Sequence, residues 1–137
     1  RSEGERANPT AVSEAGGESI LVVEDDPKVL RLTVTRLKEL NYKVIAAING
    51  PKAIEILKRH KEIDLVLSDV VMPGGMTGFD VADQALALRP EVKILLVTGY
   101  AKGVEQRNAA AAKADHRILR KPYGLKELVL ALRELLD

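Results

Sequence analysis

The chain contains no cysteine and no tryptophan, and aromatic residues make up only 3% of its 137 residues. Without cysteine it forms neither disulfide bonds nor thiolate metal sites, which excludes a disulfide-stabilised fold. No apolar run approaches the roughly 18 residues of a membrane span, and the first residues do not follow the signal-peptide pattern. Few aromatic rings and a net charge of +1 give little support to nucleic-acid binding. We therefore expect a soluble, cytoplasmic domain that contacts neither nucleic acid nor membrane.

Two regions of the chain differ in composition. Residues 1–18 are rich in Glu, Ala, Gly, Ser and Pro, and Val12 is their only large aliphatic side chain. Such a segment cannot bury enough apolar surface to offset the entropy lost on ordering, so we predict a flexible linker over 1–18. Residues 19–137 are enough for one domain with its own core. The linker at the front and the start at Arg1 rather than Met favour a piece of a longer protein with another domain upstream; processing of the chain is the alternative.

Short apolar runs recur along residues 19–137. They are Ile20–Val23, Val44–Ala47, Leu65–Leu67, Ile94–Val97 and the weaker Ile118–Leu119. An apolar run without alternation is typical of a strand covered on both faces, as in a parallel sheet. These runs therefore predict five parallel strands.

Segments with helical periodicity separate the apolar runs. Asp26 is placed to cap the first of them, with Pro27 at the first helical position. A second helix is expected from about Asn49–Pro51, a third over 78–88, and an Ala-rich fourth over about 103–114. The expected inward stripes are Leu30, Val34, Leu37 and Leu40 in the first helix, Ala53, Ile54 and Leu57 in the second, Phe79, Ala82 and Leu86 in the third, and Leu125, Leu128, Val129, Leu132, Leu135 and Leu136 in the last. Five strands alternating with five helices predict a doubly wound α/β fold with right-handed crossovers.

Polar side chains follow four of the predicted strands. They are Glu24–Asp26, Ser68–Asp69, Thr98–Gly99 and Arg120–Pro122. In a doubly wound sheet, ligands bind beyond the carboxyl ends of the strands, so these residues converge on one rim. Each has an ordinary explanation when taken singly, and Asp26 is best explained as a helix cap. Their joint placement at four strand ends is what indicates a functional site.

Several carboxylates at one rim cannot all stay ionised without a cation. An all-oxygen ligand set favours a hard metal such as Mg²⁺, which is held by one or two carboxylates together with waters and phosphate oxygens. A carboxylate can also attack phosphorus and form an aspartyl phosphate, while a lysine and a hydroxyl bind the remaining phosphoryl oxygens. The sequence therefore indicates Mg²⁺-dependent phosphoryl chemistry.

Four motifs of the chain resemble those of a known family. ILVVEDD at 20–26, LSDVVMPGGMTG at 67–78, VTG at 97–99 and RKPY at 120–123 are similar, in order and spacing, to the motifs of response-regulator receiver domains. The resemblance covers residues 19–137 and implies a flavodoxin-like, five-stranded parallel sheet of order 2-1-3-4-5. It implies that the domain accepts a phosphoryl group from a phosphohistidine in two-component signalling or a phosphorelay.

The resemblance also assigns the acidic residues. It implies that Asp69 is the phosphorylated carboxylate and that Asp25 and Asp69 hold Mg²⁺ directly. The backbone carbonyl of Val71 is then the third protein ligand, and Glu24 acts through water.

Two further residues and one peptide bond follow from the same resemblance. The hydroxyl of Thr98 and the ammonium of Lys121 are implied to bind the phosphoryl group. The family usually has a cis bond before the proline of its Lys-Pro pair, so we expect one at Lys121–Pro122.

The sequence departs from the family pattern in two places. Gly75 adds a residue to the loop after Asp69, which we expect to be longer and more mobile than usual. Ile118 stands where the family usually carries a switch aromatic, three residues before the lysine. Tyr100 and Tyr123 are the two candidates to replace it.

The long-loop motif, the TGYA segment and the linker resemble most closely the receivers attached behind the kinase core of hybrid sensor histidine kinases. The implied partners are a histidine kinase or a histidine phosphotransferase domain, with an upstream kinase core in the same full-length chain as a further candidate.

Other functions of the same fold class fit less well. A flavodoxin-type nucleotide binder needs a Gly- and hydroxyl-rich loop after its first strand, where this chain has Glu24–Asp26. A Mg²⁺-dependent phosphohydrolase would carry a second Asp two positions after its nucleophile, and position 71 is Val. A pseudo-receiver that only docks would not need the set Asp25, Asp69, Thr98 and Lys121. A P-loop is excluded because no Gly-Lys-Ser/Thr follows the glycines.

Overall fold

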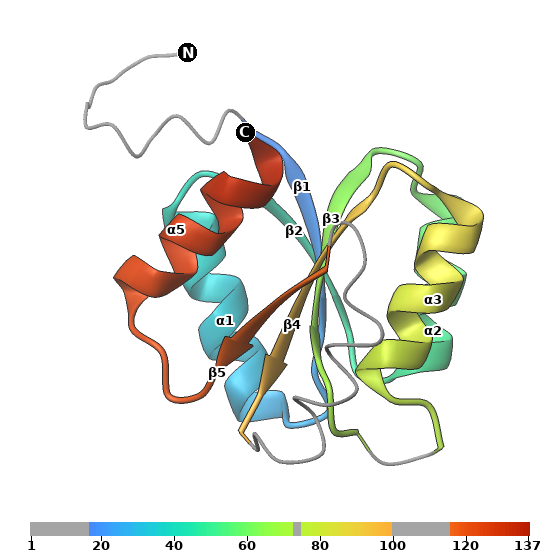
Figure 1. The fold of residues 1–137 in the computed structure, drawn as a ribbon, viewed down its shortest axis with the longest axis horizontal. Helices are drawn as coiled ribbons and strands as arrows, with labels where there is room; N and C mark the ends of the chain where they lie inside the picture. The colour runs from blue at the N-terminus through green and yellow to red at the C-terminus, as the bar shows by residue number, and fades with distance from the viewer. Residues whose placement is uncertain (1–16, 73–74, 100–115) are drawn as a thin grey trace.

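The computed structural model describes residues 17–72, 75–99 and 116–137 (Figure 1). Its centre is a parallel sheet of five strands in the order β2-β1-β3-β4-β5. The strands are β1 (Ser19–Val23), β2 (Lys43–Ala47), β3 (Ile63–Asp69), β4 (Lys93–Thr98) and β5 (His116–Arg120). The fold class and the strand order expected from the sequence are thus confirmed.

Helices cover both faces of the sheet. In Figure 1, α1 (Pro27–Glu39) and α5 (Leu125–Leu136) lie on one side, and α2 (Gly50–Arg59) and α3 (Gly78–Leu88) on the other. Successive side chains of a strand point to opposite faces, so β1 contributes to two separate cores. Leu21 and Val23 pack toward α2 and α3, whereas Ile20 and Val22 pack toward α1 and α5.

The beginning of each of three helices is fixed by a polar side chain. Asp26 Oδ1 accepts a hydrogen bond from the Lys28 amide at 2.9 Å, which confirms its predicted role as the cap of α1. Asn49 caps α2 in the same way. Thr77 and Asp80 form a reciprocal capping box at the start of α3.

The sequence pattern overestimated burial at the margins of the fold. Ala46 is exposed because β2 is an edge strand, so the expectation of cover on both faces is wrong there. Leu125, expected in the inward stripe of α5, is 49% exposed at the first residue of the helix, whereas Leu128 and Leu132 are fully buried. The predicted helix over 103–114 lies outside the described residues. Within the described ranges, the helices lack the length and apolarity needed to cross a lipid bilayer.

Candidate functional site

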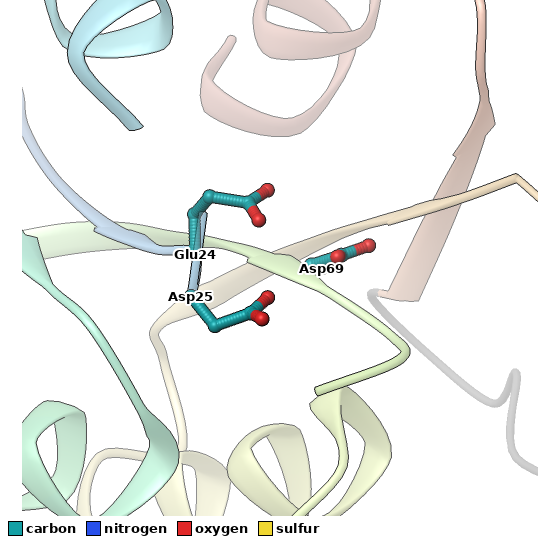
Figure 2. Close-up of side chains that lie close together, drawn as sticks. All are labelled: Glu24, Asp25 and Asp69. Carbon is teal, nitrogen blue, oxygen red and sulfur yellow. The ribbon is translucent and has the colours of Figure 1, made fainter. Parts of the chain in front are cut away.

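Three carboxylates meet at the carboxyl end of the sheet. Glu24 and Asp25 directly follow β1, and Asp69 is the last residue of β3. These strands are neighbours, and Val23 pairs with Ser68, so the residues that follow come side by side. Carboxylate oxygens of the three residues lie within 4.8 Å of one another. Figure 2 shows the side chains of Glu24 and Asp25 leaving the chain on opposite sides and turning toward the same space beside Asp69.

The backbone around Asp69 is closely packed. The amide of Val70 donates to the Val97 carbonyl at 2.9 Å, and the amide of Gly78 donates to the Val70 carbonyl at 2.9 Å. A Cβ atom on Gly78 would lie only 2.4 Å from the Asp69 carbonyl oxygen. Only glycine fits at position 78, so the start of α3 is held directly against the residue that bears the carboxylate.

Lys121 brings a positive charge to the carboxylates from the far side of the site. Its ammonium nitrogen lies 3.7 Å from Asp69 Oδ1 and 4.0 Å from Glu24 Oε1. The Lys121 amide donates to the carbonyl of Thr98 at 2.8 Å, which ties the end of β5 to the end of β4. The Lys121–Pro122 peptide bond is cis, as predicted. Thr98 is the last residue of β4 and is 1% exposed.

The charges in this cluster oppose one another. Burial raises the pKa of Glu24 above its ordinary value of 4.5, with the nearby charges of Asp69 and Asp25 acting in the same direction. Its hydrogen bond from the Asp26 amide and the charge of Lys121 act against that rise. Burial likewise raises the pKa of Asp69, which Lys121 opposes and Asp25 reinforces. One ammonium group therefore does not fully compensate three clustered carboxylates.

The donor set matches a hard divalent cation. Three carboxylates supply only oxygen atoms, and Mg²⁺ binds oxygen in preference to nitrogen or sulfur. Val71 lies two residues beyond Asp69, between the buried Val70 and Met72, and its own side chain is 58% exposed. Mg²⁺ therefore fits the residues of the cluster.

The structure adds one polar group that the sequence did not indicate. A cavity of about 20 Å³ lies beside the carboxylates and is lined in part by Glu24, Thr33, Lys121 and Tyr123. Thr33 is buried in α1 and had no distinguishing signal, since the expected stripe passed through Leu30, Val34 and Leu37. Burial raises the pKa of the Tyr123 phenol, and the nearby Thr33 hydroxyl acts against that rise.

The residues considered as replacements for the switch aromatic have different outcomes. Tyr123 packs among the apolar side chains between the sheet, α1 and α5. Ile118 is half-buried and packs on the opposite side, toward the core beneath α2 and α3. Tyr100 lies outside the described residues. The described residues therefore place the ring of Tyr123, but not Ile118, beside the acidic cluster.

Comparison with known proteins identifies relatives of the whole fold. A model of the response regulator receiver domain family matches residues 20–133. The chain is 36% identical over 124 residues to the sensor kinase CckA of Brucella abortus, a stretch that covers 90% of this chain and 13% of that kinase. It is 35% identical over 117 residues to the response regulator receiver protein CpdR of the same organism, covering 85% of this chain and 95% of CpdR.

Solved structures agree with these sequence relatives. The response regulator protein TrrA of Thermotoga maritima, in complex with Mg²⁺-BeF, superimposes with a TM-score of 0.76 at 31% identity. The match covers 87% of this chain and 99% of that one. The chain therefore spans nearly the whole of CpdR and TrrA but only a small part of CckA.

Proposed function

The chain belongs to the response regulator receiver family, and from that premise we propose that Asp69 accepts a phosphoryl group from a phosphohistidine. Receiver domains of this family act in two-component signalling. The observation that carries the proposal is the cluster of Glu24, Asp25 and Asp69 with Lys121 beside it, at the carboxyl end of the sheet. Asp69 lies closer to the lysine nitrogen than Glu24 does, at 3.7 Å against 4.0 Å.

The proposed reaction is a displacement at phosphorus. A carboxylate oxygen of Asp69 forms a bond to phosphorus while the bond from phosphorus to the imidazole nitrogen of the donor breaks, and the nitrogen keeps the electron pair. Lys121 stands 3.7 Å from the carboxylate and offsets negative charge on the transferred group. The hydroxyl of Thr98, at the adjacent strand end, is proposed to bind a phosphoryl oxygen.

We propose that Mg²⁺ is the metal of this site. Asp25 and Asp69 would hold it directly with the backbone carbonyl of Val71, and Glu24 would act through water. When bound, the cation reduces the repulsion between the anionic nucleophile and the anionic phosphoryl group. Within the protein, the burial of Glu24 and Asp69 keeps their carboxylates in a setting where opposite charges interact strongly.

The donor is proposed to be a histidine kinase or a histidine phosphotransferase domain. The similarity to part of a sensor kinase supports a further proposal, that residues 19–137 form a receiver and 1–18 a linker to a kinase core in the same chain. Mixing the chain with a separate histidine kinase core would test the proposed donor. The expected result is transfer of labelled phosphoryl groups from the kinase histidine to Asp69.

Phosphorylation by a small-molecule donor tests the site without a partner. Acetyl phosphate with Mg²⁺ should add one phosphoryl group per chain, detectable by intact-mass spectrometry and lost in base. Lys121→Ala should slow the reaction by about tenfold or more, and Asp69→Asn should abolish it. An unmodified wild-type chain that also fails to respond to beryllofluoride would instead favour the docking-only pseudo-receiver. Steady turnover of phosphate esters would favour the phosphohydrolase.

A further inference from the structure

A second feature of the site is the contact between its loop and helix α2. The loop that follows Asp69 returns to the sheet at Gly78, and Met76 lies two residues before that point. A Cβ atom on Gly50 would lie 2.5 Å from Met76 Sδ and 2.7 Å from its Cγ. The thioether chain therefore lies directly on the backbone of the first residue of α2, in a space that exists because residue 50 has no side chain.

Both ends of this contact are tied to the carboxylates. On one side, Gly78 stands against the Asp69 carbonyl, and its amide donates to Val70. On the other, the Glu24 amide donates to the Ala47 carbonyl at 3.0 Å, two residues before the Asn49 cap of α2. Short, packed connections therefore link the ends of β1 and β3 to the start of α2.

We propose that the contact between Met76 and Gly50 transmits occupation of the acidic cluster to helix α2. Gly78 packs against the Asp69 carbonyl with no free volume between them, so a shift of the backbone at Asp69 displaces Gly78 and with it Met76, two residues earlier in the chain. Met76 presses on the first turn of α2 and moves it. The inference rests on the proposed function, because it takes Asp69 to be the group whose charge and covalent state change.

The proposed movement of Met76 affects a groove on the surface of the protein. Met76 also lines an open groove of about 500 Å³ between α2 and α3, together with Pro51, Ile54, Glu55, Lys58 and Gln84. One side chain therefore belongs to the loop of the acidic site, to the start of α2 and to this groove. Occupation of the site is expected to change the shape of the groove through Met76.

Amide chemical shifts measure the link directly. Two changes to the chain with Met76 intact should each shift the amides of 50–54 as well as those of 24–26 and 69–71. One is the substitution Asp69→Asn without any ligand, and the other is addition of Mg²⁺ with beryllofluoride to the wild-type chain. In Met76→Ala the shifts at 50–54 should fall at least threefold, while those at 24–26 and 69–71 persist. Met76→Leu, which keeps the volume, and Gln84→Ala, which changes only the groove wall, should respond like wild type.

A steric exchange separates the link from general loosening of the fold. Gly50→Ala alone forces the Met76 side chain aside and should weaken the response at 51–54. In the double variant Gly50→Ala/Met76→Ala, the new methyl lies about where the Met76 chain was, 3.1 Å from the Cβ of residue 76, and should restore at least half of the wild-type response.

Two results would overturn the inference. One is a wild-type response at 50–54 in Met76→Ala, and the other is a double variant no more responsive than Met76→Ala. If the amide shifts of 24–26 and 69–71 do not change on addition of Mg²⁺ and beryllofluoride, the result counts against the proposed function instead. In that case the comparison of wild type with Asp69→Asn, which needs no ligand, still decides whether Met76 carries the link.

Discussion

At the scale of single residues, the site is defined by like charges brought together. Glu24 is 7% exposed and the Asp69 side chain is 12% exposed, yet both lie close to further carboxylates and to Lys121. Two like charges about 4 Å apart repel by roughly 1 kcal/mol even in water, and by more where water is excluded. The metal-free site is therefore a source of instability that the rest of the fold has to offset.

The sign of this effect with pH follows from the raised pKa of Asp69. A carboxyl group with a raised pKa in the folded state binds its proton more tightly there than in the unfolded chain, so its cost appears as pH rises through that raised pKa. In EDTA, Asp69→Asn should melt a few degrees above wild type at pH 7, and the difference should narrow as pH falls toward 4. Thermal unfolding across pH measures both. A difference that widens on acidification contradicts the assignment.

The lifetime of the phosphoryl group is a second prediction at this scale. Val71 and Tyr100 stand two residues after Asp69 and Thr98, and neither has a carboxylate or amide to orient an attacking water. The Val71 side chain is exposed, and Tyr100 lies outside the described residues. The family resemblance implies that these two positions cover the approach of water to phosphorus, so we expect slow hydrolysis because apolar side chains there exclude water.

Replacing both residues with polar ones tests this shielding. Val71→Asn with Tyr100→Glu should speed loss of the phosphoryl group by about tenfold, which corresponds to about 1.4 kcal/mol of barrier. The decay is followed by intact-mass spectrometry after removal of the donor. Decay at the wild-type rate in the double variant would mean that the loop after Asp69, with its added Gly75, controls access instead.

At the scale of elements, the apolar pattern was sufficient for the strands and for the described helices. Unbroken runs such as Ile94–Val97 predicted buried strands because the sheet is covered on both faces. The same pattern failed at Ala46 and Leu125, since nothing in a local run distinguishes an edge strand or a first helical turn from the interior.

Two contacts in and near the site could not be predicted from the sequence, for a related reason. The carboxylates were predictable because strand ends in a parallel sheet share one rim. The contact of Met76 with Gly50 and the placement of Thr33 beside Tyr123 depend on how distant elements pack, which no local spacing encodes.

Helix α5 is expected to respond little to occupation of the site. Leu128, Ala131 and Leu132 of α5 are completely buried against one face of the sheet. Ile118 of β5 packs on the other face, toward the core under α2 and α3. Besides the shifts expected at 24–26 and 50–54, addition of Mg²⁺ and beryllofluoride should shift amides at 69–78 and 98–104, of which 73–74 and 100–104 lie outside the described ranges. Comparable shifts over 125–136 would show that the signal reaches α5 as well.

At the scale of the whole molecule, Mg²⁺ should act as a stabilising ligand. A cation that binds only the folded chain adds about RT ln(1 + [Mg²⁺]/Kd), roughly 1–3 kcal/mol at millimolar concentration if Kd is submillimolar. Differential scanning calorimetry with and without EDTA measures the gain. The gain should shrink in Asp69→Asn, because a carboxylate ligand is lost, and an equal gain in that variant would mean that the cation binds elsewhere.

The central claim is that Asp69 carries the phosphoryl group, and mapping the modified residue tests it most directly. After reaction with acetyl phosphate and Mg²⁺, hydroxylamine converts an acyl phosphate to a hydroxamate, which tandem mass spectrometry locates in the peptide. The account predicts a hydroxamate at Asp69 in wild type and none in Asp69→Asn. A hydroxamate at Asp25 or Asp26, or a modification retained in Asp69→Asn, would contradict it.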